Sequence, residues 1–260
     1  MRKNDLAKLN MQFRYKRCED ILNWVIKNKY PDAAMTSSFQ ASGVVLIDMV
    51  IGILPDFPIY FIDTGYHFPE TLEFRDRLIH EWDLNVITVK PNPREKSPGE
   101  ANKEPLYKRD PDRCCMMNKV EPLNSLKKRL NVTAWMAAVR RDQNSNREGF
   151  NMFMYDRQGY VRVHPLIHWS GQKIWQYIHE KKLPFHPLYD KGYTSIGCFP
   201  PECTSQNHSS SNLRKGRWSH TNKTECGLHL DLVKEEENAW IRQLKLRESK
   251  NERKKTKILS

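Results

Sequence analysis

Apolar residues follow a helical spacing in some stretches of the chain and form short continuous runs in others. The helical spacing predicts helices over residues 5–30, 43–54, 69–82, 120–130 and 170–181. The short runs predict strands over residues 33–38, 58–65, 85–89, 134–139 and 161–165. Residues 90–112 are rich in Pro, Lys and Glu, which is typical of a loop. Because strands and helices alternate, we expect an α/β fold with a mostly parallel, doubly wound sheet.

Two of the predicted strands end in turns of small and polar residues. Ser37–Gly43 follows the first strand, and Asp63-Thr64-Gly65 follows the second. Ligands of such sheets bind at the carboxyl ends of the strands, near the point where the strand order reverses. The hydroxyls and backbone N–H groups of the first turn suit a phosphate or sulfate at a helix N-terminus. Each turn is equally consistent with a purely structural role, as a helix cap or a chain reversal.

The longest apolar stretch, residues 43–54, has 12 residues and contains Asp48, so we expect no transmembrane helix. The first fifteen residues lack the hydrophobic region of a secretory signal. We therefore expect a cytoplasmic protein without a membrane partner, in which the cysteines are reduced.

The chain carries 43 Lys+Arg against 31 Asp+Glu, a formal net charge of +12 at pH 7. Half of this excess, eight basic and two acidic residues, lies in residues 242–257. A solvated terminal helix and a nucleic-acid-binding tail are both consistent with that segment. The rest of the excess includes short groups of basic residues in the body of the chain: Lys119, Arg140, Arg141, Arg214 and Arg217. Each could form a surface ion pair, but together they indicate a small anionic ligand, because arginine binds phosphate or sulfate oxygens in bidentate fashion.

Four of the six cysteines form two close pairs. Cys114 and Cys115 are adjacent, and Cys198 and Cys203 bracket four residues. In a reducing compartment, two such pairs suit the four thiolate ligands of an iron–sulfur cluster. A zinc site with four cysteine ligands and unliganded buried thiols are the competing interpretations. Cys18, within the first predicted helix, we interpret as incidental.

Cys226 stands apart, beyond a polar stretch at residues 205–212 that we interpret as a hinge. Lys223 and His229 lie close to it in the sequence, and nearby cations favour the reactive thiolate form. A free cysteine on a C-terminal arm is therefore a candidate nucleophile.

These residues belong to a longer series of motifs that resembles one family. In chain order the motifs are Phe61-Ile-Asp-Thr-Gly65, Phe68-Pro-Glu-Thr71, Cys114-Cys115, Lys119-Val-Glu-Pro122, Arg140-Arg141-Asp-Gln143, Tyr193-Thr-Ser-Ile-Gly-Cys198, Gly216-Arg-Trp218 and Glu225-Cys-Gly-Leu-His229. They resemble the assimilatory adenylyl-sulfate (APS) and phosphoadenylyl-sulfate (PAPS) reductases, in the same order, over roughly residues 33–230.

The resemblance implies the adenine-nucleotide alpha-hydrolase (PP-loop) fold and a role for each motif. Cys226 resembles the nucleophile that attacks the sulfur of the sulfo-nucleotide and expels AMP, leaving an S-sulfonate that thioredoxin or glutaredoxin resolves to sulfite. The Ser37–Gly43 turn lacks the Ser-Gly-Gly-x-Asp-Ser pattern of the ATP-cleaving relatives, in agreement with cleavage of an S–O bond. The residues that resemble substrate-binding positions are Ser37, Ser38, Phe39, Ser42, Gly43, Asp63, Thr64, Gly65, Lys119, Arg140, Arg141, Arg214, Arg217 and His229.

The paired cysteines resemble the [4Fe–4S] branch of the family, which implies APS as the main substrate. The implied cluster ligands are Cys114, Cys115, Cys198 and Cys203. The second pair departs from the family, because four residues separate its cysteines where the family has two, and this makes Cys203 the least secure ligand. Ser38-Phe39 is closer to the PAPS branch, so reduction of PAPS, or of both nucleotides, is an alternative.

We expect three parts: a nucleotide-binding reductase domain with the iron–sulfur site (residues 1–204), a hinge and catalytic-cysteine arm (205–230) and a basic tail (231–260). The predicted function is reduction of APS to sulfite and AMP in assimilatory sulfate reduction, with thioredoxin or glutaredoxin as a separate electron donor. A sulfur-transfer or nucleic-acid-binding protein of the PP-loop type is the alternative of another class, but it leaves the motif around Cys226 unexplained. We do not expect nucleic acid as a partner, and the sequence leaves open whether the chain forms a homo-oligomer.

Overall fold

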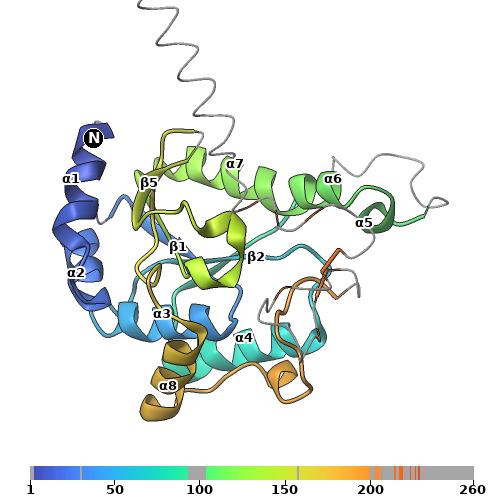
Figure 1. Ribbon diagram of the computed structural model, residues 1–260. Helices are drawn as coiled ribbons and strands as arrows, with labels where there is room; N and C mark the ends of the chain where they lie inside the picture. The colour runs from blue at the N-terminus through green and yellow to red at the C-terminus, as the bar shows by residue number, and fades with distance from the viewer. Residues whose placement is uncertain are drawn as a thin grey trace, which may run out of the picture.

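The computed structural model describes residues 3–29, 31–92, 104–156, 158–199, 203, 204, 206, 214, 217, 218, 223, 226 and 228 (Figure 1). A six-stranded sheet, in the order β3-β2-β1-β4-β6-β5, forms its centre. The strands are β1 (Ala33–Thr36), β2 (Ile59–Ile62), β3 (Val86–Val89), β4 (Ala134–Ala137), β5 (Phe153–Tyr155) and β6 (Val161–Val163). Neighbouring strands are parallel except for β5 and β6, which are antiparallel. The predicted α/β fold with a mostly parallel sheet is confirmed.

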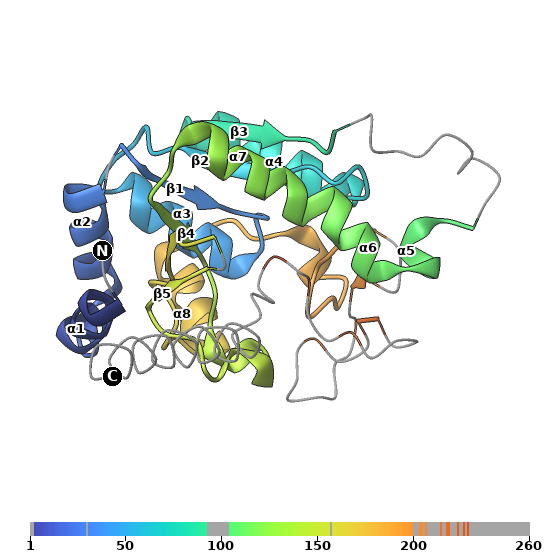
Figure 2. The ribbon, with the colours of Figure 1, turned by 90° about the horizontal axis from the view of Figure 1, so that it is seen from above.

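Helices connect the strands and cover both faces of the sheet. They are α1 (Lys3–Phe13), α2 (Cys18–Lys29), α3 (Ala41–Ile51), α4 (Pro69–Trp82), α5 (Leu106–Arg109), α6 (Pro111–Cys115), α7 (Glu121–Leu130) and α8 (Gly171–Lys181). A π-helical turn, η2 (Met116–Val120), joins α6 to α7, and three short 3-10 turns follow: η3 (Arg141–Gln143), η4 (Ser145–Arg147) and η5 (Pro187–Tyr189). Figures 1 and 2 show α7 on one side of the sheet and α3 and α8 on the other. Among the described residues, no helix is long and apolar enough to span a membrane.

Successive side chains of each strand point to opposite faces, so each face has its own core. Met35, Phe61 and Met136 pack into a large core with residues of α1, α2, α3, α4 and α8. Tyr60 and Trp135 pack into a smaller core with the apolar side of α7. Both faces of the central strands are therefore covered, which explains why these strands read as continuous apolar runs.

The strand order reverses between β1 and β4. From β1 the chain winds outward through β2 and β3, and from β4 it winds the other way toward β6. The loops after β1 and β4 therefore separate above the sheet and leave room for a ligand. Ser37 follows β1, and Arg140 follows β4, so both predicted anion-binding segments lie at this switch point.

Three local features differ from the sequence-based expectation. The predicted helix over residues 5–30 is two helices, α1 and α2, separated at residues 14–17. The predicted loop over residues 90–112 contains α5 and the start of α6, whose first turn is held by Arg113 N–H donating to the Asp110 side chain (2.9 Å). Strand β5 was not predicted, because three residues are too short to show a period.

Candidate active site

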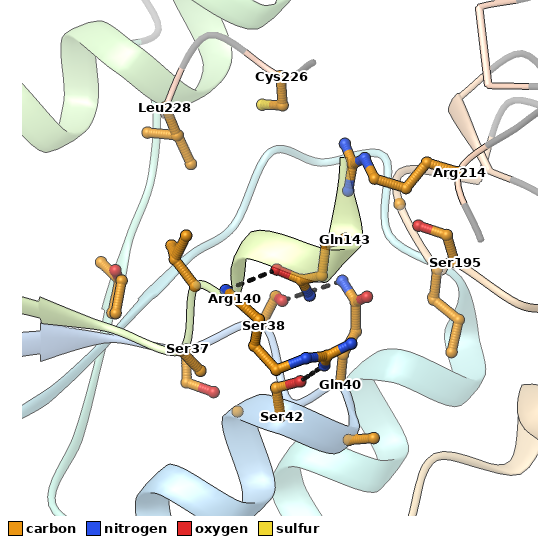
Figure 3. Close-up of a pocket in the computed structure, with 18 of the residues that line it drawn as sticks. Ser37, Ser38, Gln40, Ser42, Arg140, Gln143, Ser195, Arg214, Cys226 and Leu228 are labelled. Carbon is orange, nitrogen blue, oxygen red and sulfur yellow. Dashed lines mark hydrogen bonds between the residues drawn. The ribbon is translucent and has the colours of Figure 1, made fainter. Parts of the chain in front are cut away.

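A cavity of about 230 Å3 lies at the carboxyl ends of β1 and β4 (Figure 3). It is lined by the loop after β1, the loop after β4, the π-helical turn η2 and residues of the C-terminal segment. Cys226 and Leu228 lie on one side of it and Ser42 on the opposite side, with Arg140 and Gln143 between them. Nine of the fifteen residues predicted to be catalytic or substrate-binding line it: Ser37, Ser38, Ser42, Gly43, Lys119, Arg140, Arg214, Arg217 and Cys226.

The turn after β1 presents hydroxyl groups to the cavity. Phe39 adopts a left-handed conformation (φ 56°), and its N–H donates to Ser37 Oγ at 3.1 Å. Gly43 closes the turn, because a Cβ at this position would lie 2.6 Å from Ser37 Oγ. A side chain at this position would displace Ser37 Oγ and disturb its hydrogen bond with Phe39 N–H.

Arg140 joins the turn after β4 to the turn after β1. Its side chain is 4 % exposed, and Nη1 donates to Ser42 Oγ. Nε forms an ion pair with Asp142 at 2.9 Å, and the backbone N–H donates to Gln143 Oε1 at 3.0 Å. These partners hold the guanidinium in one orientation beside the start of α3.

The cavity is strongly basic. Seven cationic side chains line it, while no Asp or Glu is found among the described lining residues. They are Lys119, Lys127, Arg140, Arg147, Arg162, Arg214 and Arg217. Lys127 is neutralised by a buried ion pair with Asp156, but the remaining charge suits a ligand with several negative charges.

Cys226 is 7 % exposed and lies close to the sulfur of Cys115. A hydrogen bond from the Cys115 thiol, helped by the charges of Lys119 and Arg217, lowers the pKa of Cys226 well below its usual range despite burial. Burial alone would favour a neutral Lys119, but the neighbouring sulfurs, above all the Cys226 thiolate, raise its pKa, so the amine stays charged. A thiolate beside a lysine and an arginine is the arrangement of a nucleophilic cysteine.

Contacts within the domain hold the segment that carries Cys226. Leu228 packs against the core under α7, and its carbonyl oxygen accepts a hydrogen bond from Arg162 Nη2 at 2.9 Å. Arg162 lies on β6, so the sheet itself helps to orient the segment that carries Cys226.

A second, smaller cavity adjoins the first. Its lining includes the four remaining candidate thiols: Cys114, Cys115, Cys198 and Cys203. Asn118 Nδ2 donates to Cys114 Sγ, and Thr64 Oγ1 lies within hydrogen-bond distance of Cys198 Sγ, both at 3.6 Å. Lys119 lines both cavities, so it connects the thiols with the basic site.

Cys203 reaches the other thiols in spite of the longer spacing to Cys198. Its carbonyl oxygen would lie 2.0 Å from a Cβ at position 197, so the chain returns directly over Gly197. The next residue, Thr204, donates from Oγ1 to the carbonyl of Ser195 at 2.7 Å. These contacts place Cys203 beside Cys198 at the same cavity.

Five predicted substrate-binding residues lie elsewhere. Phe39 is buried in the core against Phe61 (5.9 Å between ring centroids). Asp63 accepts from Gly65 N–H at 3.0 Å, which makes this pair a local turn, and Thr64 faces the thiol cavity. Arg141 points away from the basic cavity, because its Nε donates to the carbonyl of Phe150 at 2.9 Å. His229 is outside the described residues.

Sequence reasoning also missed several residues of the basic cavity. Gln143, Arg147, Arg162, Trp135 and Ser195 all line it. Arg162 had a detectable signal, because a charged residue between two valines of a buried strand needs a specific partner. Gln143 and Ser195 also had a signal, because they belong to the motifs Arg140–Gln143 and Tyr193–Cys198. Trp135 had none, since it sits in ordinary apolar sequence.

A basic cavity at the switch point of a doubly wound sheet, with a buried cysteine at its edge, is typical of a protein that binds an anionic nucleotide. Comparison with known proteins agrees with this class. Residues 32–206 match the model of the phosphoadenosine phosphosulfate reductase domain. The adenosine 5'-phosphosulfate reductase of Halalkalibacterium halodurans is 37 % identical over 227 residues, which cover 86 % of this chain and 96 % of that protein. The chain therefore belongs to the phosphoadenosine phosphosulfate reductase family.

Solved structures support the fold. The phosphoadenylyl-sulfate reductase of Candida auris, in a phosphate complex, superimposes with a TM-score of 0.67 at 23 % identity, covering 76 % of this chain and 96 % of that one. The FMN adenylyltransferase of Candida glabrata, bound to FAD and pyrophosphate, gives a TM-score of 0.54 at 16 % identity, covering 80 % and 73 %. The predicted adenine-nucleotide alpha-hydrolase type of fold is confirmed.

Proposed function

We propose that this protein is an adenylyl-sulfate reductase of assimilatory sulfate reduction, with Cys226 as its nucleophile. The observation that carries the proposal is the position of Cys226, which lines the same cavity as Lys119, Arg214 and Arg217. The close relatives named as APS reductases support the choice of substrate. A cytoplasmic location agrees with the use of reduced thiols.

The proposed reaction consists of two displacements by thiolates, followed by resolution of a mixed disulfide. The Cys226 thiolate attacks the sulfur of APS, the bond from sulfur to the bridging oxygen breaks, and AMP leaves with the electron pair. The cations of the cavity neutralise the charge that develops on AMP. One thiol of reduced thioredoxin or glutaredoxin then attacks Sγ of Cys226 and releases sulfite, and its second thiol resolves the mixed disulfide.

The test is sulfite release from APS by the full chain with reduced thioredoxin. We expect Cys226→Ser to lower turnover by about three orders of magnitude or more, with APS binding retained. Without reductant, wild type should carry one sulfonate group on the peptide that contains Cys226. Cys18→Ser is the matched control, because Cys18 is buried in α2 away from the cavity and should leave turnover unchanged. Turnover by Cys226→Ser would remove the assignment.

We propose that the thiol cavity holds a [4Fe–4S] cluster. Its cysteines supply four thiolates, the usual ligand set of such a cluster. Among the described residues, no three His, Cys, Asp or Glu groups are close enough to hold one ion. When bound, the cluster supplies a cross-link between two chain segments and negative charge beside Lys119. Iron and sulfide analysis after anaerobic purification tests this, and stoichiometric zinc in their place would contradict it.

PAPS is the alternative substrate, because six cationic side chains besides the ion-paired Lys127 line the cavity, and PAPS carries one phosphate more than APS. Rates with the two nucleotides decide between them, and equal or faster turnover of PAPS would overturn the preference for APS.

The alternative of another class is a nucleic-acid-binding protein that uses the basic segment at residues 242–257. Such a protein should bind RNA or DNA with strong salt dependence, and removal of residues 242–260 should abolish this binding. We expect instead that the truncated chain keeps its sulfite-forming activity, because the described residues that line the cavity end at Leu228.

A further inference from the structure

Trp218 is buried in a conformation that tryptophan rarely adopts. It is 2 % exposed, and its φ of 53° lies in the left-handed region. Such a conformation costs free energy in a bulky residue and persists only where surrounding contacts over-determine it. The contacts of Trp218 therefore indicate what the conformation is for.

One set of contacts is with cations. The guanidinium of Arg217 lies 4.4 Å from the ring centroid, Lys223 Nζ 5.4 Å and the guanidinium of Arg214 5.9 Å. Cation–π attraction is strongest in such desolvated surroundings. Arg217 and Arg214 both line the basic cavity, so the Trp218 ring contacts two of the cations of this cavity.

Arg217 is only partly held by other groups. Its Nη1 donates to Ser195 Oγ at 3.1 Å, while Nε is buried without a hydrogen-bond partner among the described residues. Figure 3 shows Ser195 and Arg214 on the same side of the cavity. A guanidinium with a spare buried N–H beside this cavity is ready to bind an anionic oxygen.

The other set of contacts is with thiols. Trp218 packs in one buried group with Cys115, Cys198, Cys203 and Cys226. Lys223, which lies over the same ring, pairs with Asp112 on α6, one turn before the two adjacent cysteines.

We propose that Trp218 is a positioning residue that holds the arginines for the sulfate end of the nucleotide and the Cys203 thiol as one unit. The identity of the nucleotide rests on the proposed function. A tryptophan that only stabilises the core would affect binding of all parts of the nucleotide equally. Loss of a positioning tryptophan should weaken binding of the sulfate end alone, so the two roles predict different affinities.

The experiment compares APS with AMP by calorimetry in a Cys226→Ser parent, in which the nucleotide stays intact. Trp218→Leu removes the ring, and Trp218→Phe keeps an aromatic face but removes the N–H. Trp24→Leu is the matched control, because Trp24 packs on Phe13 and Phe153 at the far end of the core. Iron content of each anaerobically purified variant is measured alongside.

We expect Trp218→Leu to weaken APS binding about 5- to 30-fold and AMP binding less than about twofold, the range of a desolvated cation–π contact. Trp218→Phe should retain most of the APS affinity. Both variants should lose iron, because a smaller side chain no longer fills the space beside Cys115, Cys198 and Cys203. Trp24→Leu should lower stability without changing the ratio of the two affinities. Equal weakening of APS and AMP, or wild-type affinities in Trp218→Leu, overturns the proposal. A parent that binds neither nucleotide instead contradicts the proposed function, and the inference falls with it.

Discussion

Gly197 lets Cys203 lie beside Cys198 although four residues separate the two cysteines. The backbone of Cys203 passes so close to position 197 that any side chain there would overlap its carbonyl group. The guanidinium of Arg217 occupies the remaining space, with Nη2 2.7 Å from the position of a Cβ. A single residue without a side chain thus lets the thiol site and the basic cavity share a wall.

We therefore predict that Gly197→Ala displaces Cys203 and lowers the iron bound per chain, because a Cβ 2.0 Å from a backbone oxygen forces the chain to shift. Iron analysis and thermal unfolding measure the effect. Gly149→Ala is the control, since a Cβ at the exposed Gly149 meets nothing within 4 Å. Full iron content in Gly197→Ala would show that the close approach does not hold Cys203.

At the scale of elements, the continuous run α6–η2–α7 carries one side of both cavities. It carries the adjacent cysteines at the end of α6, presents Lys119 from the π-helical turn, and ends on the core under the sheet. Such π turns change which side chains share a helix face, and they are frequent at functional sites. Helical periodicity indicated only the part beyond residue 120, because α6 has five residues and begins with Asp110-Pro111.

One buried ion pair ties this run to the sheet. Lys127 of α7 and Asp156 after β5 form a pair whose side chains are 5 % and 4 % exposed. Asp156 Oδ1 also accepts from the N–H groups of Gln158 and Tyr160, both at 3.0 Å, so it shapes the turn into β6.

We predict that Asp156→Asn lowers the free energy of unfolding by about 3–5 kcal/mol, because it leaves a buried lysine without its counter-charge. Urea unfolding measures the loss. The double variant Lys127→Met/Asp156→Asn should recover most of it, because it removes the buried charge and keeps a turn acceptor. A loss below about 1 kcal/mol in the single variant would contradict a buried pair.

At the scale of the whole molecule, buried histidines make stability depend on pH. His186 Nδ1 accepts from Leu188 N–H (3.2 Å), and Nε2 lies 2.9 Å from Thr71 Oγ1, so the ring is neutral with its proton on Nε2. Burial lowers the pKa of His186 to about 4 and that of His164 to about 3. An unfolded histidine titrates near about 6.5.

Between the pKa of folded His186, about 4, and that of an unfolded histidine, about 6.5, the folded chain therefore binds fewer protons than the unfolded chain. We predict that the free energy of unfolding is highest above about pH 6.5 and falls as the pH is lowered toward 4, by on the order of 3 kcal/mol for His186. Urea unfolding across this range measures the slope. His186→Asn, which keeps an acceptor for Leu188, should flatten it, whereas His80→Gln on the exposed side of α4 should not. An unchanged slope in His186→Asn would refute the assignment.

The alternation of strands and helices and the two turns after β1 and β2 were predictable from the amino-acid sequence alone. The cysteines and basic residues of the candidate site were predictable in the same way. These are local properties, since apolar period, turn chemistry and motif spacing are set by neighbours along the chain. Arg140 and Arg141 show the limit. They are adjacent and chemically equal, yet one lines the cavity and the other bonds to Phe150, because the turn after β4 aims them in opposite directions.

Contacts between residues that are distant in the sequence were visible only in the tertiary structure. The return of Cys203 over Gly197, the contact of Arg162 with Leu228 and the cations around Trp218 join segments that no spacing relates. Each depends on packing between the sheet, the α6–η2–α7 run and the C-terminal segment, and burial in that packing gives these polar contacts their strength. The residue types of the candidate site could be predicted from the sequence, but their arrangement around one cavity depends on the tertiary fold.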